Sequence, residues 1–134
     1  IDIALEVIKA YGFTFKTKFP WIKTTPLNHH LNYGTGYWVR GVSEDVLIAT
    51  RGNVPAPRLD GFLGLIGPNV EHSRKPQDVH SLAESTTPGP YLEVFARYQR
   101  AGWVSFGNEN RGLQPQDRIP SIYPPWLKSS EAAQ

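Results

Sequence analysis

Three residues with hydrogen-bonding side chains come directly after two short apolar segments. Arg97 follows the segment YLEVFA, and Asn108 and Glu109 follow the segment GWVSFG. If both segments are strands of an open α/β sheet, their carboxyl ends lie where such sheets bind ligands. The sequence therefore predicts that these three side chains gather at one sheet edge and form several hydrogen bonds with a polar ligand.

A basic turn, EHSRKP, precedes a predicted helix that begins at Pro76. The exposed amides and the positive dipole end of a helix amino terminus attract anions, and Lys75 adds a full charge. A solvated basic turn is the alternative interpretation. The polar residues at the strand ends favour ligand binding, because they are expected at the same sheet edge. We therefore expect Lys75 to bind an anionic group.

The segment NYGTGYWVRGVSE places aromatic and charged side chains close together before an apolar run. Aromatic faces can stack on a base that has left its helix, and an arginine can bind a phosphate. Tyr37, Trp38 and Arg40 are therefore candidates for binding nucleic acid, with Glu44 close behind them. A loop anchored by buried aromatic side chains explains the same composition equally well.

The composition excludes several kinds of site. The 134 residues contain no cysteine, which excludes disulfides, thiolate metal ligands and a cysteine nucleophile. The histidines lack the spacing of a metal site, and no Gly-x-Ser-x-Gly nucleophile motif occurs, so we expect neither a metal nor a serine hydrolase. A net charge of +2 allows a polyanionic partner without requiring one. The absence of a long apolar run or a signal-peptide pattern favours a cytoplasmic protein.

The first third of the chain predicts a helix and two strands. The opening helix ends at Gly12, and its apolar face is expected to contain Ile3, Ala4, Val7, Ile8 and Tyr11. A half-exposed strand follows over residues 13–24, and Pro20 places it at a sheet edge or bends it. The apolar run DVLIAT, residues 45–50, is expected to be a buried parallel strand.

The remaining elements are expected in a similar alternation. Residues 51–71, including the glycine-rich GFLGLIG, are predicted to be a long irregular connection with tight turns. A helix from Pro76 and strands over residues 91–96 and 102–107 follow. This order predicts an α/β fold with one three-layer sheet. Residues 110–134 are expected to be an extended or disordered, proline-rich tail.

Three segments together resemble one family. They are GYWVRGVSEDVLIATRGN, EHSRKPQDVHSLAE and PGPYLEVFARYQRAGWVSFGNE. The chain is similar over residues 3–109 to the MT-A70-type adenine-N(6)-methyltransferases, which transfer a methyl group from S-adenosylmethionine to adenine in DNA or RNA. The resemblance implies a Rossmann-like, S-adenosylmethionine-dependent methyltransferase fold over residues 1–109. It also implies that the target base is bound after it has been flipped from its stack.

The resemblance also implies a role for each candidate residue. Lys75 would bind the methionine carboxylate of the cofactor. Arg97, Asn108 and Glu109 would bind its ribose and adenine. The remaining candidates would face the target nucleotide: Tyr37, Trp38 and Arg40 as nucleic-acid-binding residues, and Glu44 as the catalytic candidate.

The sequence departs from the family pattern at its main catalytic motif. That motif, Asp-Pro-Pro-Trp, should precede the opening helix, and its Asp and a backbone carbonyl would accept hydrogen bonds from the adenine amine. The chain contains only IYPPW, where Tyr123 occupies the acid position. A chance sequence and a circular permutation both explain it, but a tyrosine cannot accept as a carboxylate does. Ser43 and Gln99 are smaller departures.

These observations lead to two functional hypotheses. The first is the cofactor-binding half of an S-adenosylmethionine-dependent adenine methyltransferase, with DNA favoured as substrate and the amino-terminal part of the domain missing. The alternative is a noncatalytic, methyltransferase-like nucleic-acid-binding or scaffold subunit. Either protein could form an oligomer or associate with a partner subunit.

Overall fold

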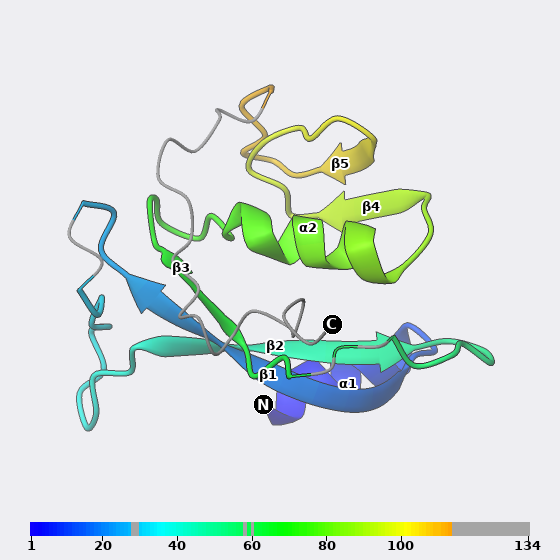
Figure 1. Cartoon of the computed structure of the whole chain (residues 1–134), viewed down its shortest axis with the longest axis horizontal. Helices are drawn as coiled ribbons and strands as arrows, with labels where there is room; N and C mark the ends of the chain where they lie inside the picture. Colours follow the sequence, from blue (N-terminus) through cyan, green and yellow to red (C-terminus); the bar gives the residue numbers. More distant parts are fainter. Residues whose placement is uncertain (28–29, 58, 60, 114–134) are drawn as a thin grey trace, which may run out of the picture.

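The computed structural model describes residues 1–27, 30–57, 59 and 61–113. A three-stranded sheet lies between two helices, and a two-stranded sheet covers the far side of the second helix (Figure 1). The elements, in chain order, are α1 (Asp2–Ala10), β1 (Thr14–Thr24), β2 (Ser43–Thr50), β3 (Leu65–Pro68), α2 (Gln77–Thr86), β4 (Tyr91–Val94) and β5 (Trp103–Phe106). None of the described helices is long and apolar enough to span a membrane.

The three-stranded sheet has the order β2-β1-β3. β1 pairs antiparallel with β2 and parallel with β3. The prediction that residues 45–50 form a buried parallel strand was therefore wrong, because β2 is an antiparallel edge strand whose residues are half-buried or exposed. Its apolar run is consistent with a sheet that has α1 on one side and α2 on the other (Figure 1). Such coverage does not determine strand direction.

β1 is the central strand of this sheet, so the edge position, one of the two alternatives that Pro20 suggested, was wrong. Pro20 is tolerated because β3 pairs only with Trp21–Thr24, which leaves the Pro20 nitrogen outside that ladder. The register of β1 against β2 also shifts between Phe15 and Thr17. Gly64, directly before β3, lies so close to β1 that a Cβ there would be 2.7 Å from the carbonyl oxygen of Pro20.

The tight turns expected in GFLGLIG are partly replaced by β3. Leu65, Gly67 and Pro68 are buried in this strand. A four-residue segment that contains glycine and proline carries little strand propensity, and its pairing with β1 determines its conformation instead. The long connection over residues 51–71 therefore contributes part of the core.

The hydrophobic core lies between the three-stranded sheet and α2. Its buried residues are Phe19, Trp21 and Leu65, and half-buried apolar side chains, including Val79 and Leu82 of α2, pack against them. Trp21 is only 2% exposed, and its indole nitrogen donates to the carbonyl oxygen of Gly67 at 3.2 Å. Val79 and Leu82 therefore form the face of α2 that packs on the core.

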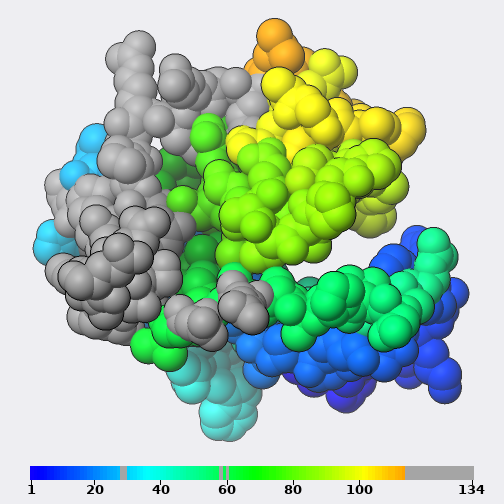
Figure 2. Space-filling model, turned by 45° about the vertical axis from the view of Figure 1, so that its right-hand side comes forward, coloured from blue at the N-terminus to red at the C-terminus, as the bar shows by residue number. Residues whose placement is uncertain are grey.

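β4 and β5 form a second, parallel sheet of their own. The single three-layer sheet expected from the sequence is therefore wrong in detail, although the mixed α/β composition is confirmed. The sheet faces α2 with Tyr91, Glu93, Trp103 and Ser105, and its outer face carries side chains that are more than half exposed: Leu92, Val94, Val104 and Phe106. In the space-filling view, an open notch separates the α2 layer from the β1–β2 layer on the side where β2 ends (Figure 2).

The opening helix agrees with its predicted bounds but not with its predicted burial. Gly12 has a φ of 75° and follows the helix end, as expected for a glycine stop. Only Ala4 and Ile8 of the predicted inner face are half-buried, whereas Ile3, Val7 and Tyr11 are exposed. α1 therefore contacts β1 along a narrow strip.

Candidate functional site

The carboxyl ends of β4 and β5 lie side by side because the two strands are parallel. The amide of Ala96 donates to the carbonyl oxygen of Phe106 at 2.7 Å, and Gly107 permits this approach, since a Cβ there would lie 2.1 Å from the Ala96 oxygen. A cavity of about 380 Å³ opens at this edge. Its lining includes all three residues that the sequence placed at the strand ends: Arg97, Asn108 and Glu109.

A second cavity, of about 430 Å³, adjoins the first. It lies between the turn before α2 and the end of β4, and it shares Val94, Phe95 and Arg97 with the strand-end cavity. Its other lining residues are Ser73, Arg74, Lys75, His80, Glu93 and Tyr98. Lys75 therefore lines a cavity that shares three residues with the one beside the strand ends.

Both cavities are built partly from strained backbone. In the described part of the chain, the non-glycine residues with positive φ are Ser73, at 61°, and Phe95, at 64°. Both line the larger cavity, and Phe95 also lines the smaller one. Such conformations cost about 1–3 kcal/mol each and gather at binding and catalytic sites.

Charged side chains in the two cavities are already paired. Arg97 forms an ion pair with Glu109 across the strand-end cavity. Lys75 forms an ion pair with Glu44, at 2.9 Å between the ammonium nitrogen and Oε2. A lysine ammonium has three N–H donors, so the pairing of Lys75 with Glu44 leaves donors for a ligand.

Glu44 lies between two lysines rather than among the aromatic residues that precede it. Its Oε1 accepts from Lys23 at 3.2 Å and its Oε2 from Lys75. Partial burial raises the pKa of this carboxyl, but the hydrogen bonds and charges of Lys75 and then Lys23 bring it below its ordinary value. Glu44 is therefore an ionised carboxylate that links the start of β2 to the turn before α2.

The aromatic loop lies apart from the two cavities. Tyr37 and Trp38 are 97% and 93% exposed, and Arg40 is also exposed. The two rings contact each other edge to face at 6.3 Å. The interpretation of this segment as a loop anchored by buried aromatic side chains is therefore wrong. Neither cavity has these residues in its lining.

Comparison with known proteins identifies the family. The family model of MT-A70 matches residues 1–109. This chain belongs to the MT-A70 family. It is 28% identical over 133 residues to a putative N(6)-adenosine-methyltransferase MT-A70-like of Medicago truncatula, covering 92% of this chain and 22% of that protein.

Two further plant proteins named as MT-A70-like N(6)-adenosine-methyltransferases are also similar. The protein of Arabidopsis thaliana is 29% identical over 118 residues, which covers 85% of this chain and 17% of that protein. The protein of Oryza sativa subsp. japonica, named as probable, is 29% identical over 133 residues, or 92% of this chain and 19% of that protein. The MT-A70 chain thus spans about a fifth of the length of the relatives it matches.

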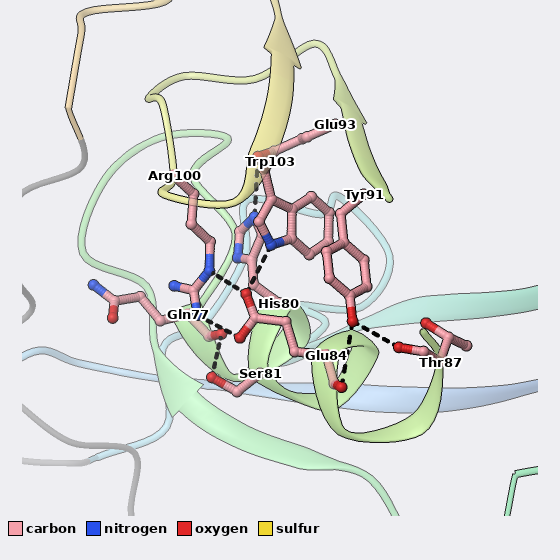
Figure 3. A network of polar contacts seen from close by, with 9 residues as sticks. All are labelled: Gln77, His80, Ser81, Glu84, Thr87, Tyr91, Glu93, Arg100 and Trp103. Atoms are coloured by element: carbon pink, nitrogen blue, oxygen red, sulfur yellow. Dashed lines mark hydrogen bonds and ion pairs between the residues drawn. The ribbon is translucent and has the colours of Figure 1, made fainter. Parts of the chain in front are cut away.

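A polar network fixes the two-stranded sheet of this MT-A70 chain to α2 (Figure 3). The carboxylate of Glu84 accepts two hydrogen bonds from Arg100, at 2.8 and 3.0 Å, and one from the indole of Trp103, at 2.7 Å. These hydrogen bonds, first that of Arg100 and then that of Trp103, lower the pKa of Glu84 to about 2. Tyr91 stacks on Trp103 at 4.9 Å and donates to the carbonyl oxygen of Thr87 at 2.6 Å.

A second network holds the turn that carries Lys75. Glu71 accepts a hydrogen bond from the hydroxyl of Tyr98 at 2.9 Å and pairs with Arg111. These partners, Tyr98 first, lower the pKa of Glu71. Arg74 lies over the ring of Tyr98 at 5.1 Å. The start of the predicted tail, around Arg111, therefore helps to shape the larger cavity of the MT-A70 chain.

The two networks were not predicted from the sequence. His80 and Glu84 are four residues apart on α2 and so share one helix face, which is the signal that could have indicated a polar interface. In the described part of the chain, no group of three or more His, Asp or Glu side chains could hold a metal ion. The IYPPW segment lies outside the described residues, and the structure does not test the predicted conformation of residues 114–134.

Proposed function

We propose that this chain binds S-adenosylmethionine and forms the cofactor-binding part of an adenine-N(6)-methyltransferase that acts on nucleic acid. The observation that carries the proposal is that the four cofactor candidates line two adjoining cavities: Lys75, Arg97, Asn108 and Glu109. Family membership supplies the reaction class. A Rossmann-like arrangement, in which β4 and β5 belong to the cofactor-binding sheet and α2 packs on it, is part of the same proposal, as is a single partial domain over residues 1–109.

The chemistry of the cavities fits this cofactor. The strand-end cavity offers a guanidinium, an amide and a carboxylate, which supply the donors and acceptors that ribose hydroxyls and an adenine ring need. The adjoining cavity offers Lys75 to a carboxylate. Each volume lies within the range of roughly 300–1,000 Å³ typical of small-molecule sites. When bound, the cofactor supplies an electrophilic sulfonium methyl group, and the protein supplies position and electrostatics.

The acceptor belongs to the proposal as well. The relatives are named for adenosine, a ribonucleoside, which favours RNA over the DNA expected from the sequence. The exposed Tyr37 and Trp38 would stack on a flipped base, and Arg40 would bind a phosphate. Glu44 would connect the two sites, because it lies at the start of β2 and pairs with Lys75. A cytoplasmic location and a nucleic-acid or subunit partner remain proposals of the same kind.

Calorimetry with S-adenosylmethionine and S-adenosylhomocysteine tests the cofactor proposal. The chain is expected to bind both ligands. Substitution Lys75→Ala or Arg97→Ala should weaken binding roughly 10-fold or more, because a hydrogen bond to a charged group contributes about 1.5–3 kcal/mol. Lys18→Ala is the matched control, since Lys18 pairs with Asp45 and lines neither cavity. An equal loss of ligand affinity in all three variants would count against the proposal. So would a folded wild-type chain that binds neither ligand.

A second function is favoured by the exposure of the aromatic loop. Tyr37 and Trp38 are exposed although large aromatic side chains are costly to leave in water, as expected of a surface that binds another molecule. This surface would serve a noncatalytic nucleic-acid-binding subunit without any cofactor. That function predicts salt-sensitive binding of single-stranded RNA or DNA without affinity for S-adenosylhomocysteine. Charge reversal by Arg40→Glu should weaken nucleic-acid binding, and unchanged binding would argue against this function.

A further inference from the structure

The outer face of the two-stranded sheet carries an apolar patch that is open to water. We call it the outer patch, and its side chains are 54–60% exposed: Leu92, Val94, Val104 and Phe106. The register pairs Leu92 with Val104 and Val94 with Phe106, so the four side chains are continuous. Parallel sheets are almost always covered on both faces, whereas the described elements cover only the face towards α2 (Figure 1). A further apolar segment is therefore expected on the outer patch.

The carboxyl-terminal part of the chain contains an apolar segment of suitable composition. Residues 119–127, IPSIYPPWL, include five large apolar or aromatic side chains and no charged residue. The flanking segments QPQDR and KSSEAAQ contain no large apolar residue. Three of the nine residues are prolines, whose fixed φ reduces the conformational entropy that an extended segment loses on docking. The segment therefore combines apolar area with a low entropic cost of binding.

The chain leaves the described residues beside the same sheet. The amide of Gln99, in the connection between β4 and β5, donates to the carbonyl oxygen of Gly112 at 2.6 Å, and Leu113 forms a bridge with Gln99. From Leu113 to Ile119 an extended chain spans up to about 20 Å. A strand of the length of β4 is only about 13 Å long. The connection is thus long enough for residues 119–127 to reach the outer patch.

This segment fits the outer patch better than a second copy of the chain does. A stable interface between two proteins takes about 20–30 residues from each side, and the outer patch has four. A segment of the same chain is tethered, so it binds a small surface at a high effective concentration. Two of the relatives also match 92% of the chain, so their similarity continues beyond residue 109, where the family model ends.

We propose that residues 119–127 dock on the outer face of β4 and β5 and cover the outer patch. This inference does not depend on the binding of S-adenosylmethionine. It gives the IYPPW segment a role that requires no acid at the position of Tyr123. Because Val94 and Phe106 also line the strand-end cavity, the docked segment lies beside that cavity.

Paramagnetic relaxation enhancement tests the docking in the full chain. The chain contains no cysteine, so Ser121→Cys provides a single site for a nitroxide label within the segment. In a ¹H–¹⁵N spectrum, the amides of the outer patch should lose most of their intensity. Trp126→Asp in the labelled chain should restore them, because a charge replaces the largest apolar side chain of the segment. Ser130→Asp places the same charge outside the apolar segment, and this matched control should leave the broadening unchanged.

A second variant tests the docking from the side of the sheet. Val104→Lys places a charge in the outer patch and should restore the amide of Leu92 in the labelled chain. Val39→Lys is the matched control, since Val39 is an exposed valine that lies outside the outer patch, and it should keep the broadening.

Three results would overturn the proposal. The first is broadening confined to residues 110–113, which are close to the label in sequence. The second is broadening centred on another surface, such as Tyr37 and Trp38. The third is broadening of the outer patch in a ¹⁵N-labelled chain without nitroxide that is mixed with a nitroxide-labelled chain without ¹⁵N, since a second copy would then occupy the patch.

Discussion

The two faces of α2 meet their neighbours through different interactions. One face packs Val79 and Leu82 against the core around Trp21. The other presents His80 and Glu84 to the two-stranded sheet, where they meet Glu93, Arg100 and Trp103 in polar contacts. Apolar burial is strong but non-directional, whereas hydrogen bonds fix orientation. We therefore expect the apolar face to contribute more to stability, and the polar face to fix the orientation of the two-stranded sheet on α2.

The largest expected effect comes from breaking the apolar face. Trp21→Ala should lower the free energy of unfolding by about 3–5 kcal/mol, because it removes a buried aromatic side chain and leaves a cavity. Denaturant unfolding followed by circular dichroism measures this change. Trp38→Ala is the matched control, since Trp38 is exposed, and its effect should stay within about 0.5 kcal/mol. Similar losses in the two variants would contradict the assignment of the core.

A smaller effect is expected from the polar face. Glu84→Gln should lower the free energy of unfolding by about 1 kcal/mol at neutral pH, a discounted value because the side chain is 34% exposed. The folded-state pKa of about 2 lies below the ordinary value of 4.5, so the ionised carboxylate stabilises the fold above pH 4.5. That contribution is lost as the pH falls from 4.5 towards 2.

Denaturant unfolding of the wild type and of Glu84→Gln at several pH values tests this pH dependence of stability. The two proteins should differ in stability at neutral pH and converge as the pH approaches 2. Glu6→Gln, on the exposed surface of α1, is the control and should behave as the wild type throughout. A difference between wild type and Glu84→Gln that stays constant with pH would contradict the proposed contacts of Glu84.

The smallest effect is expected from a single hydroxyl group. Tyr91→Phe removes the hydrogen bond to Thr87 but keeps the stacked ring on Trp103, so it should cost about 0.5–1 kcal/mol. Tyr37→Phe removes an equivalent hydroxyl from a side chain that is 97% exposed and should be neutral. Thermal unfolding compares the two variants. Equal midpoints would show that the hydroxyl of Tyr91 does not help to hold the two-stranded sheet on α2.

The sequence predicted which candidate residues lie together better than it predicted the sheet. Arg97, Asn108 and Glu109 gather in one cavity because the strands that precede them are parallel, and this follows from local pattern and a general property of α/β sheets. The helix before which Lys75 lies was predicted for similar local reasons. These predictions depend only on residues that are close together in the sequence. Long-range pairing therefore does not alter them.

Features that depend on distant pairing were not predictable. β3 is four residues long and exists because it pairs with β1, about forty residues earlier in the sequence. The antiparallel direction of β2 was hidden by its apolar run. The contacts of Glu84 with Arg100 and Trp103 depend on the path of the intervening turn and strand. The resemblance to the family assigned roles to residues but gave no contacts between them.

Nuclear magnetic resonance with S-adenosylhomocysteine tests the central claim most directly. The claim is that the ligand occupies the cavity beside the turn before α2 and the adjoining cavity at the ends of β4 and β5. In a ¹H–¹⁵N spectrum of the chain, the largest shift changes on titration should fall on the amides of Lys75, Phe95, Arg97, Asn108 and Glu109. Shift changes centred instead on Tyr37 and Trp38, or spectra that do not change at saturating ligand, would contradict the claim.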